Sequence, residues 1–118
     1  MEGATLSRLE RALRKERASL RQQLTEHGAD PERPNELVFE FEGGFADSAH
    51  TTAERAGLVA LVEGLAQNLA EVERALQKVE AGAAYGVCER CGRPIAPERL
   101  EALPWARLCI ECKQRDSR

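Results

Sequence analysis

Residues 58–79 read LVALVEGLAQNLAEVERALQKV and contain the strongest periodic pattern in the chain. The large apolar residues are separated by alternating steps of four and three positions, at Leu58, Val62, Leu65, Leu69, Val72, Leu76 and Val79. These steps place the apolar side chains on one seam of an α-helix, as in a coiled coil. The pattern predicts a helix over residues 51–81, roughly 45 Å long at about 1.5 Å per residue, with a seam that needs a partner.

An N-terminal helix can supply this partner. Leucines recur at every seventh position at Leu6, Leu13 and Leu20, with Leu9 and Leu24 beside them. This spacing predicts a helix over residues 5–27. Two helices of one chain bury their apolar stripes without the entropic cost of association, so an antiparallel hairpin is favoured over a homodimeric coiled coil.

The helix ends have their own signals. Ser7-x-x-Glu10 and Thr51-x-x-Glu54 have the spacing of capping boxes, which places them near the two helix starts. Gly82 is expected to end the second helix in the left-handed conformation. The predicted helical hairpin therefore occupies residues 1–82.

The segment between the helices, residues 28–50, is predicted to form a loop at the tip of the hairpin. It contains Pro31, Pro34, Gly43 and Gly44 and lacks a helical period, although residues 37–42 are compatible with a short extended stretch. The loop is strongly acidic. Between Gly28 and Asp47, Arg33 is the only basic residue and the acidic residues are Asp30, Glu32, Glu36, Glu40, Glu42 and Asp47.

Four cysteines follow the second helix in two C-x2-C pairs, which are Cys88 with Cys91 and Cys109 with Cys112. Two such turns can bring four thiolates around one tetrahedral zinc ion. Four protein ligands leave the ion no open position, so its predicted role is structural. Residues 83–118 are thus predicted to form a zinc finger that ends in a short helix over residues 109–115. The apolar residues expected to pack inside this finger are Ile95, Leu100, Leu103 and Trp105.

Composition excludes several function classes. The chain has 118 residues, 31% charged and 4% aromatic, and a net charge of −3, so it has no overall attraction to polyanions. It lacks a secretory signal and an apolar run long enough to span a membrane, so a cytoplasmic protein without membrane association is expected. No phosphate-binding glycine loop, nucleophile elbow or HExxH motif is present, and catalysis by this chain is not expected.

The finger carries the clearest resemblance to a known family. A helical hairpin followed by a four-cysteine finger resembles the DksA/TraR family of bacterial transcription factors. The matching segments are Lys78-Val79-Glu80, residues 85–95 (YGVCERCGRPI), residues 99–104 (RLEALP) and residues 108–113 (LCIECK). The resemblance covers roughly residues 47–113. It implies a regulator that binds RNA polymerase and inserts the hairpin tip through the secondary channel to modulate initiation.

The family's tip motif is Asp-x-x-Asp-x-Ala, and it can be compared with residues 44–49 of this chain. Asp47 and Ala49 match the second acid and the alanine, whereas Gly44 stands in place of the first acid. A single tip acid implies an allosteric effect on the polymerase rather than transcript cleavage. Asp47 can also be read as a cap of the second helix, because it precedes Thr51 and the seam.

Some members of the family share a guanosine tetraphosphate site with the polymerase, lined by basic residues on the second helix. This chain has no Lys or Arg between Ala56 and Glu73, which speaks against dependence on this nucleotide. A weak anion site is left open at Arg74, Lys78, Lys113, Arg115 and Arg118.

Two other function classes compete with a monomeric polymerase regulator. One is a small zinc-finger module that binds nucleic acid directly, and the other is a structural or dimerisation protein. A nucleic-acid reader is expected to carry a basic surface. Residues 88–118 contain seven Lys or Arg against five Asp or Glu, an excess of only two, so direct sequence-specific DNA contact is not expected.

Overall fold

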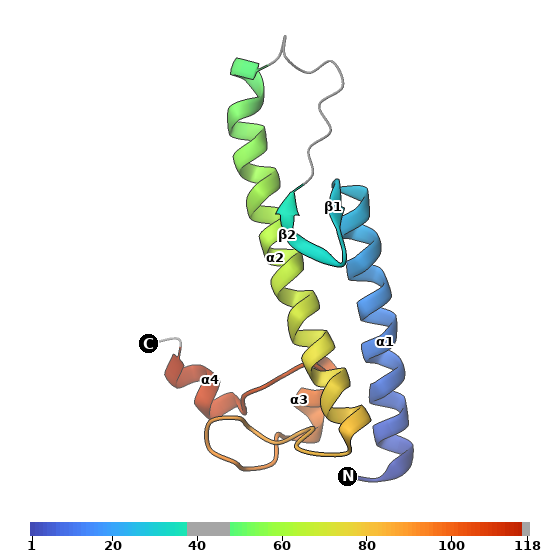
Figure 1. The fold of residues 1–118 in the computed structure, drawn as a ribbon. Coiled ribbons are helices and arrows are strands. Elements are labelled where there is room, and N and C mark those ends of the chain that lie inside the picture. Colours follow the sequence, from blue (N-terminus) through green and yellow to red (C-terminus); the bar gives the residue numbers. More distant parts are fainter. Residues whose placement is uncertain (38–47, 117–118) are drawn as a thin grey trace. The chain divides into compact units, whose positions relative to one another are not determined.

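The computed structural model describes residues 1–37 and 48–116, with side chains for residues 1–33 and 53–116. The elements follow in the order α1 (Gly3–Glu26), β1 (Ala29–Asp30), β2 (Arg33–Leu37), α2 (Ser48–Ala81), α3 (Pro97–Ala102) and α4 (Ile110–Asp116) (Figure 1). The predicted all-α fold is confirmed: two long antiparallel helices precede a four-cysteine finger and a short C-terminal helix. The two short strands form a small antiparallel hairpin in addition.

The chain divides into two compact units, and each unit contains a segment of both long helices. One unit comprises residues 18–69, and the other comprises residues 1–17 and 70–118. In the first unit, the buried apolar residues are Leu20 and Leu24 of α1, Ala29 of β1, and Val62, Leu65, Ala66 and Leu69 of α2. The helix segments run in opposite directions within the unit (Figure 1).

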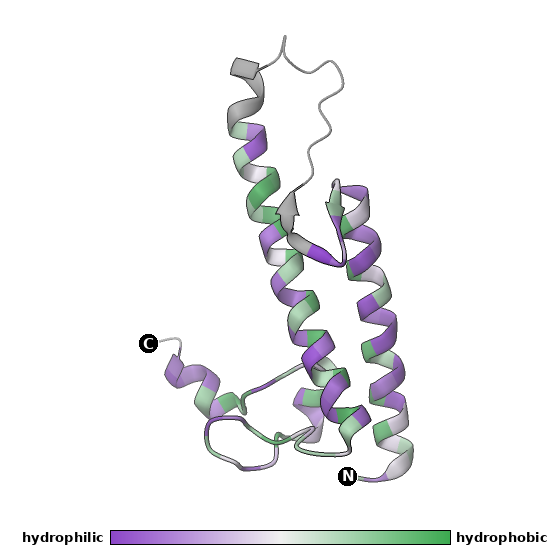
Figure 2. Ribbon diagram, viewed as in Figure 1, coloured by the Kyte–Doolittle hydropathy of each residue, from purple (hydrophilic) through white to green (hydrophobic). Residues whose placement is uncertain are grey.

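The second unit buries Leu9 and Leu13 of α1 together with Val72, Ala75 and Leu76 of α2. The predicted seam is therefore confirmed at its five central positions, from Val62 to Leu76, whereas Leu58 and Val79 at its ends are partly exposed. Figure 2 shows that α1 is largely hydrophilic with isolated hydrophobic residues and that α2 carries more of the hydrophobic residues. The leucine spacing identified the buried face of both helices.

The C-terminal end of α2 has the predicted glycine cap. Gly82 has a φ of 66°, and its N–H donates to the Val79 carbonyl at 3.1 Å. The N–H of Ala83 donates to the Lys78 carbonyl, also at 3.1 Å. These two bonds make a Schellman motif, which satisfies carbonyl groups that the end of the helix leaves without partners.

The capping-box expectations at the helix starts were wrong. α1 begins at Gly3 and α2 begins at Ser48, so Ser7 and Thr51 lie inside helices. Helical hydrogen bonding starts before Ser7, because the N–H of Leu6 donates to the Glu2 carbonyl at 2.9 Å. A residue can cap a helix only where the backbone N–H groups of the next turn have no intrahelical partner.

The segment after α1 contains regular structure that was expected to be loop. Ala29 pairs with Leu37, and Asp30 pairs with Arg33. The turn between them is stabilised by the Asp30 carboxylate, whose Oδ1 accepts a hydrogen bond from the N–H of Glu32 at 2.9 Å. An aspartate followed by proline favours such a turn, because its side chain mimics a backbone acceptor. The expected extended stretch over residues 37–42 lies outside the described residues apart from Leu37.

None of the helices in the described part of the chain combines the length and the hydrophobicity that a membrane-spanning helix needs.

Candidate metal centre

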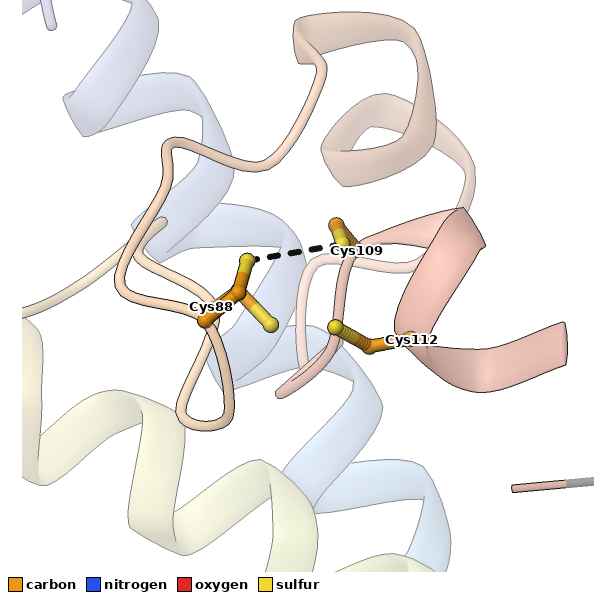
Figure 3. Close-up of side chains that lie close together, drawn as sticks. Cys88, Cys109 and Cys112 are labelled. Carbon is orange, nitrogen blue, oxygen red and sulfur yellow. Dashed lines mark hydrogen bonds between the residues drawn. The ribbon is translucent and has the colours of Figure 1, made fainter. Parts of the chain in front are cut away.

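The four cysteines come together in space. Their Sγ atoms all lie within 4.8 Å of one another, and the Sγ atoms of Cys91 and Cys109 are 3.8 Å apart. A tetrahedral ion with four sulfur ligands at about 2.3 Å separates neighbouring sulfurs by about 3.8 Å. Figure 3 shows the thiols of Cys88, Cys109 and Cys112 turned toward one another. The group has the size of a four-thiolate zinc site.

The backbone around Cys88 forms a tight turn that presents the first cysteine pair. The N–H of Cys88 donates to the Arg93 carbonyl at 2.8 Å, and the N–H of Gly92 donates to the Cys88 carbonyl at 3.0 Å. Gly92 has a φ of 75°, a conformation that residues with a Cβ rarely adopt. The turn is flanked by an antiparallel bridge between Val87 and Pro94.

The second cysteine pair lies at the start of α4. The N–H of Lys113 donates to the Cys109 carbonyl at 2.9 Å, so the first helical turn carries both thiols on one side. The predicted short C-terminal helix over residues 109–115 corresponds to α4, Ile110–Asp116.

The thiols sit in different environments. Cys88 and Cys112 are buried, whereas Cys91 is exposed. Burial acts to raise the pKa of the Cys88 thiol, but hydrogen bonds from the backbone N–H groups of Cys109, Cys91 and Arg90 outweigh it and lower the pKa to about 6. Burial and hydrogen bonds with the neighbouring thiols raise the pKa of Cys112 to about 12. The two buried thiols therefore differ in acidity, and Cys88 is the more acidic of the two.

The chemistry of this donor set fits zinc. A set of four sulfur ligands selects soft or borderline cations, and a tetrahedral arrangement of thiolates is typical of structural zinc. Since all four ligand positions are taken by protein, a bound zinc ion would stabilise the fold rather than activate water. The chain therefore has a site for one zinc ion.

The metal centre borders a small apolar cluster. Its buried members are Leu9, Cys88, Ile95, Leu100 and Cys112, and the partly buried residues packed against them are Tyr85, Ala106, Leu108 and Cys109. The prediction of Ile95 and Leu100 as core residues is confirmed, whereas Leu103 and Trp105 are only partly buried. Leu9 comes from α1, and no local sequence signal assigns it to the finger.

Three ion pairs connect the finger to α2. The Glu89 carboxylate, between the first two cysteines, lies 3.1 Å from Arg74 and 3.3 Å from Lys78. Arg107 of the finger lies 3.8 Å from Glu71. The α2 residues in these pairs lie at positions 71, 74 and 78, which share one helical face. These contacts were not predicted from the sequence, although the spacing of the three α2 residues indicates a common face.

The two predicted tip residues cannot be placed in the same way. Asp47 lies outside the described residues. Ala49 lies in the first turn of α2, where its backbone is described and its side chain is not.

Three comparisons relate this chain to known proteins. The family model described as "Prokaryotic dksA/traR C4-type zinc finger" matches residues 83–118. "General stress protein 16O" of Bacillus subtilis is 56% identical over 45 residues, which are 38% of this chain and 27% of that protein. The "RNA polymerase-binding transcription factor DksA" of Caulobacter vibrioides is 36% identical over 73 residues, 62% of this chain and 51% of that protein. The chain thus spans less than two thirds of the length of either relative.

A solved structure extends the likeness to the helices. The transcription factor DksA2 from Pseudomonas aeruginosa matches with a TM-score of 0.75 and 29% sequence identity, covering 99% of this chain and 86% of that chain. The finger model covers the four cysteines, and the structural match also covers the helices that precede them. Residues 83–118 thus match the finger of the DksA/TraR family, and the chain as a whole is similar in fold to DksA2.

Proposed function

We propose that this protein regulates transcription by binding RNA polymerase directly and inserting the tip of its helical hairpin through the secondary channel. The observation that carries the proposal is the match of nearly the whole chain to a DksA-type transcription factor. A second relative, from Caulobacter vibrioides, is named as an RNA polymerase-binding transcription factor. Both matches are longer than the finger of residues 83–118, so the likeness is not confined to a common metal-binding motif.

The proposed agent at the polymerase is the acidic segment between the helices. Residues 28–47 contain six acidic residues against one basic residue, and we propose that this negative charge acts inside the polymerase channel. Asp47 and Ala49 are the proposed tip residues. Because Gly44 stands in place of a second acid, we propose that the tip biases mobile elements of the polymerase and does not hold a catalytic metal.

The proposed role of the zinc finger is architectural. Cys88, Cys91, Cys109 and Cys112 are the proposed ligands, and with four thiolates the ion has no position for water or substrate. We therefore propose a protein without enzymatic activity, acting as a monomer in the cytoplasm. The lack of basic residues in the middle of α2 supports regulation that does not depend on guanosine tetraphosphate.

Direct binding to nucleic acid is the second candidate, and charge pairing disfavours it. Arg90 of the finger is paired with Asp116, and Arg107 lies 3.8 Å from Glu71. Arg74 and Lys78 of α2 share the carboxylate of Glu89. A nucleic-acid surface needs cations that are free to replace counterions on phosphates, whereas these side chains already face acids of the same chain.

Co-elution of the purified zinc-loaded protein with core RNA polymerase, in the absence of DNA, tests the proposal. We expect a stable complex and no shift of duplex or single-stranded DNA under the same conditions. A photo-reactive residue in the 38–47 segment should then crosslink to polymerase peptides that line the secondary channel. Binding to DNA without binding to polymerase would overturn the proposal and favour the second candidate.

A further inference from the structure

The metal centre is not closed by the finger alone, because one of its apolar neighbours comes from the other end of the chain. Leu9 of α1 is 2% exposed and lies in the same buried cluster as Cys88 at 1% and Cys112 at 3%. The remaining buried members, Ile95 and Leu100, belong to the finger. The compact unit that contains the cysteines accordingly includes residues 1–17 as well as residues 70–118.

Other contacts hold the first turns of α1 in this place. Arg8, next to Leu9, forms an ion pair with Glu101 of α3. One turn and a half further along, Arg14 lies 3.6 Å from Glu80 at the end of α2. The Arg8 pair joins α1 to the finger and the Arg14 pair joins α1 to α2, and because both pairs are exposed each contributes little energy. The face of α1 that carries Leu9 therefore lies against the buried cluster that contains Cys88 and Cys112.

We propose that Leu9 is a positioning residue of the metal centre: the N-terminal half of α1 forms an apolar wall that keeps the buried cysteines closed on the ion and so controls how fast zinc is released. A ligand thiol can dissociate only if its side chain can swing away from the ion and if water or a competing ligand can enter. Close packing restricts both movements, since a buried side chain has no free volume into which to rotate.

Packing between the N-terminal half of α1 and the metal centre stabilises both partners. If the wall and the metal centre stabilise each other, removal of the metal loosens the wall as well. The loosened region should then extend over the whole compact unit of residues 1–17 and 70–118 and should not end at residue 83, where the finger begins. Residues 3–17 of α1 should lose protection with the finger, whereas residues 18–26 of the same helix should keep it. This inference does not depend on polymerase binding.

α1 offers a matched pair of leucines for a kinetic test. Leu20 is 3% exposed, nearly the same as Leu9, but belongs to the other compact unit. Zinc release from the full-length protein is followed with a chromogenic chelator in excess. We expect Leu9→Ala to release zinc at least about tenfold faster than the parent, since a factor of ten corresponds to about 1.4 kcal/mol. Leu20→Ala should release zinc at the parental rate.

Two further measurements make the result unambiguous. The visible spectrum of the cobalt-substituted Leu9→Ala variant should match that of the parent, which shows that four thiolates still bind the metal. Hydrogen exchange of the unmodified protein, with and without zinc, needs no variant and is decisive even if Leu9→Ala folds poorly. Equal release rates for Leu9→Ala and the parent, equal acceleration by Leu20→Ala, or unchanged protection of residues 3–17 after zinc removal would each overturn the proposal.

Discussion

Glu89 Oε1 lies 3.1 Å from Arg74 Nη2, so the turn that carries the first two cysteines is tied to a cation of α2. The same carboxylate lies 3.3 Å from Lys78 Nζ through its other oxygen. The Glu89 side chain is 28% exposed and Lys78 is 22% exposed, so water screens this contact less than a fully exposed pair. The metal centre is thus linked to α2 by charge and to α1 by apolar packing.

This ion pair predicts a salt-dependent effect of Glu89→Gln. The variant keeps the shape of the side chain and removes its charge, and we expect a loss of about 1 kcal/mol in unfolding free energy at low salt. The loss should shrink at high salt because the attraction is electrostatic. Denaturant unfolding of the zinc-loaded protein measures it, with Glu98→Gln on α3 as a control. A loss that does not change with salt would indicate that the amide disturbs the cysteine turn instead.

Metal removal is expected to unfold the finger and to loosen residues 3–17 of α1, which belong to the same compact unit. We predict one zinc ion per chain, held by Cys88, Cys91, Cys109 and Cys112, in protein purified without chelator. Structural zinc can contribute on the order of 10 kcal/mol to a small module, so chelation should unfold residues 83–116. Most of the helical circular dichroism should persist, because the helix segments of residues 18–69 have their own buried core. A metal assay without stoichiometric zinc would contradict this prediction.

The seam of α2 allows a comparison between a buried and an exposed leucine. Leu69 is 2% exposed, whereas Leu61, eight residues earlier on the same helix, is 45% exposed. Leu69→Glu places an unpaired charge in the core, and we expect it to lower the unfolding free energy by roughly 3 kcal/mol or more. Leu61→Glu should change it by less than about 0.5 kcal/mol. Thermal melting followed by circular dichroism measures both, and similar melting of the two variants would show that the seam is misassigned.

Tyr85 makes the stability of the finger depend on pH in the alkaline range. Its hydroxyl donates to the Pro104 carbonyl at 2.9 Å, and burial, together with the charge of Glu101, raises its pKa from 10.0 to about 12. Between these values the unfolded chain loses the phenol proton and the folded chain keeps it. Stability from this source is therefore complete below pH 10 and is lost as the pH rises toward 12.

Because Tyr85 is the only tyrosine of the chain, the ultraviolet absorbance of tyrosinate reports its titration directly. We expect a midpoint well above that of the denatured protein. Tyr85→Phe should lose about 1 kcal/mol at neutral pH through the missing hydrogen bond, and its stability should fall less steeply in alkali. Identical titration midpoints for the folded and denatured protein would exclude a buried, hydrogen-bonded phenol.

Asp47 distinguishes a helix cap from a charge that acts at the polymerase. It immediately precedes Ser48, the first residue of α2, so Asp47→Ala is expected to cost about 1 kcal/mol if the side chain caps the helix. Asp47→Asn keeps a capping oxygen and removes the charge. We expect Asp47→Asn to melt like the parent and to bind polymerase, but to lose most of its effect on initiation in a purified transcription assay. Normal regulation by Asp47→Asn would assign the residue to capping alone.

Local patterns in the sequence were sufficient to predict the helices and the residues that make up the metal centre. Leucines and valines at steps of three and four select one helical face, because side chains at those steps share a side of the helix. Each C-x2-C pair is likewise a local feature, since two thiols three positions apart can lie on the same side of one turn. The buried seam residues Val62 and Leu69 and the convergence of four cysteines were predictable for this reason.

Contacts between segments that are far apart along the chain could not be predicted from local patterns and became apparent only in the folded structure. Leu9 lies beside the heptad leucines of α1, as Leu24 does, yet it packs with Cys88 and Cys112, because folding brings the start of α1 to the finger. Glu89 is an ordinary charged residue in sequence and becomes a link to Arg74 only when the cysteine turn lies against α2. Periodicity records which side of a helix is buried, whereas the partner of that side depends on how segments far apart along the chain meet in space.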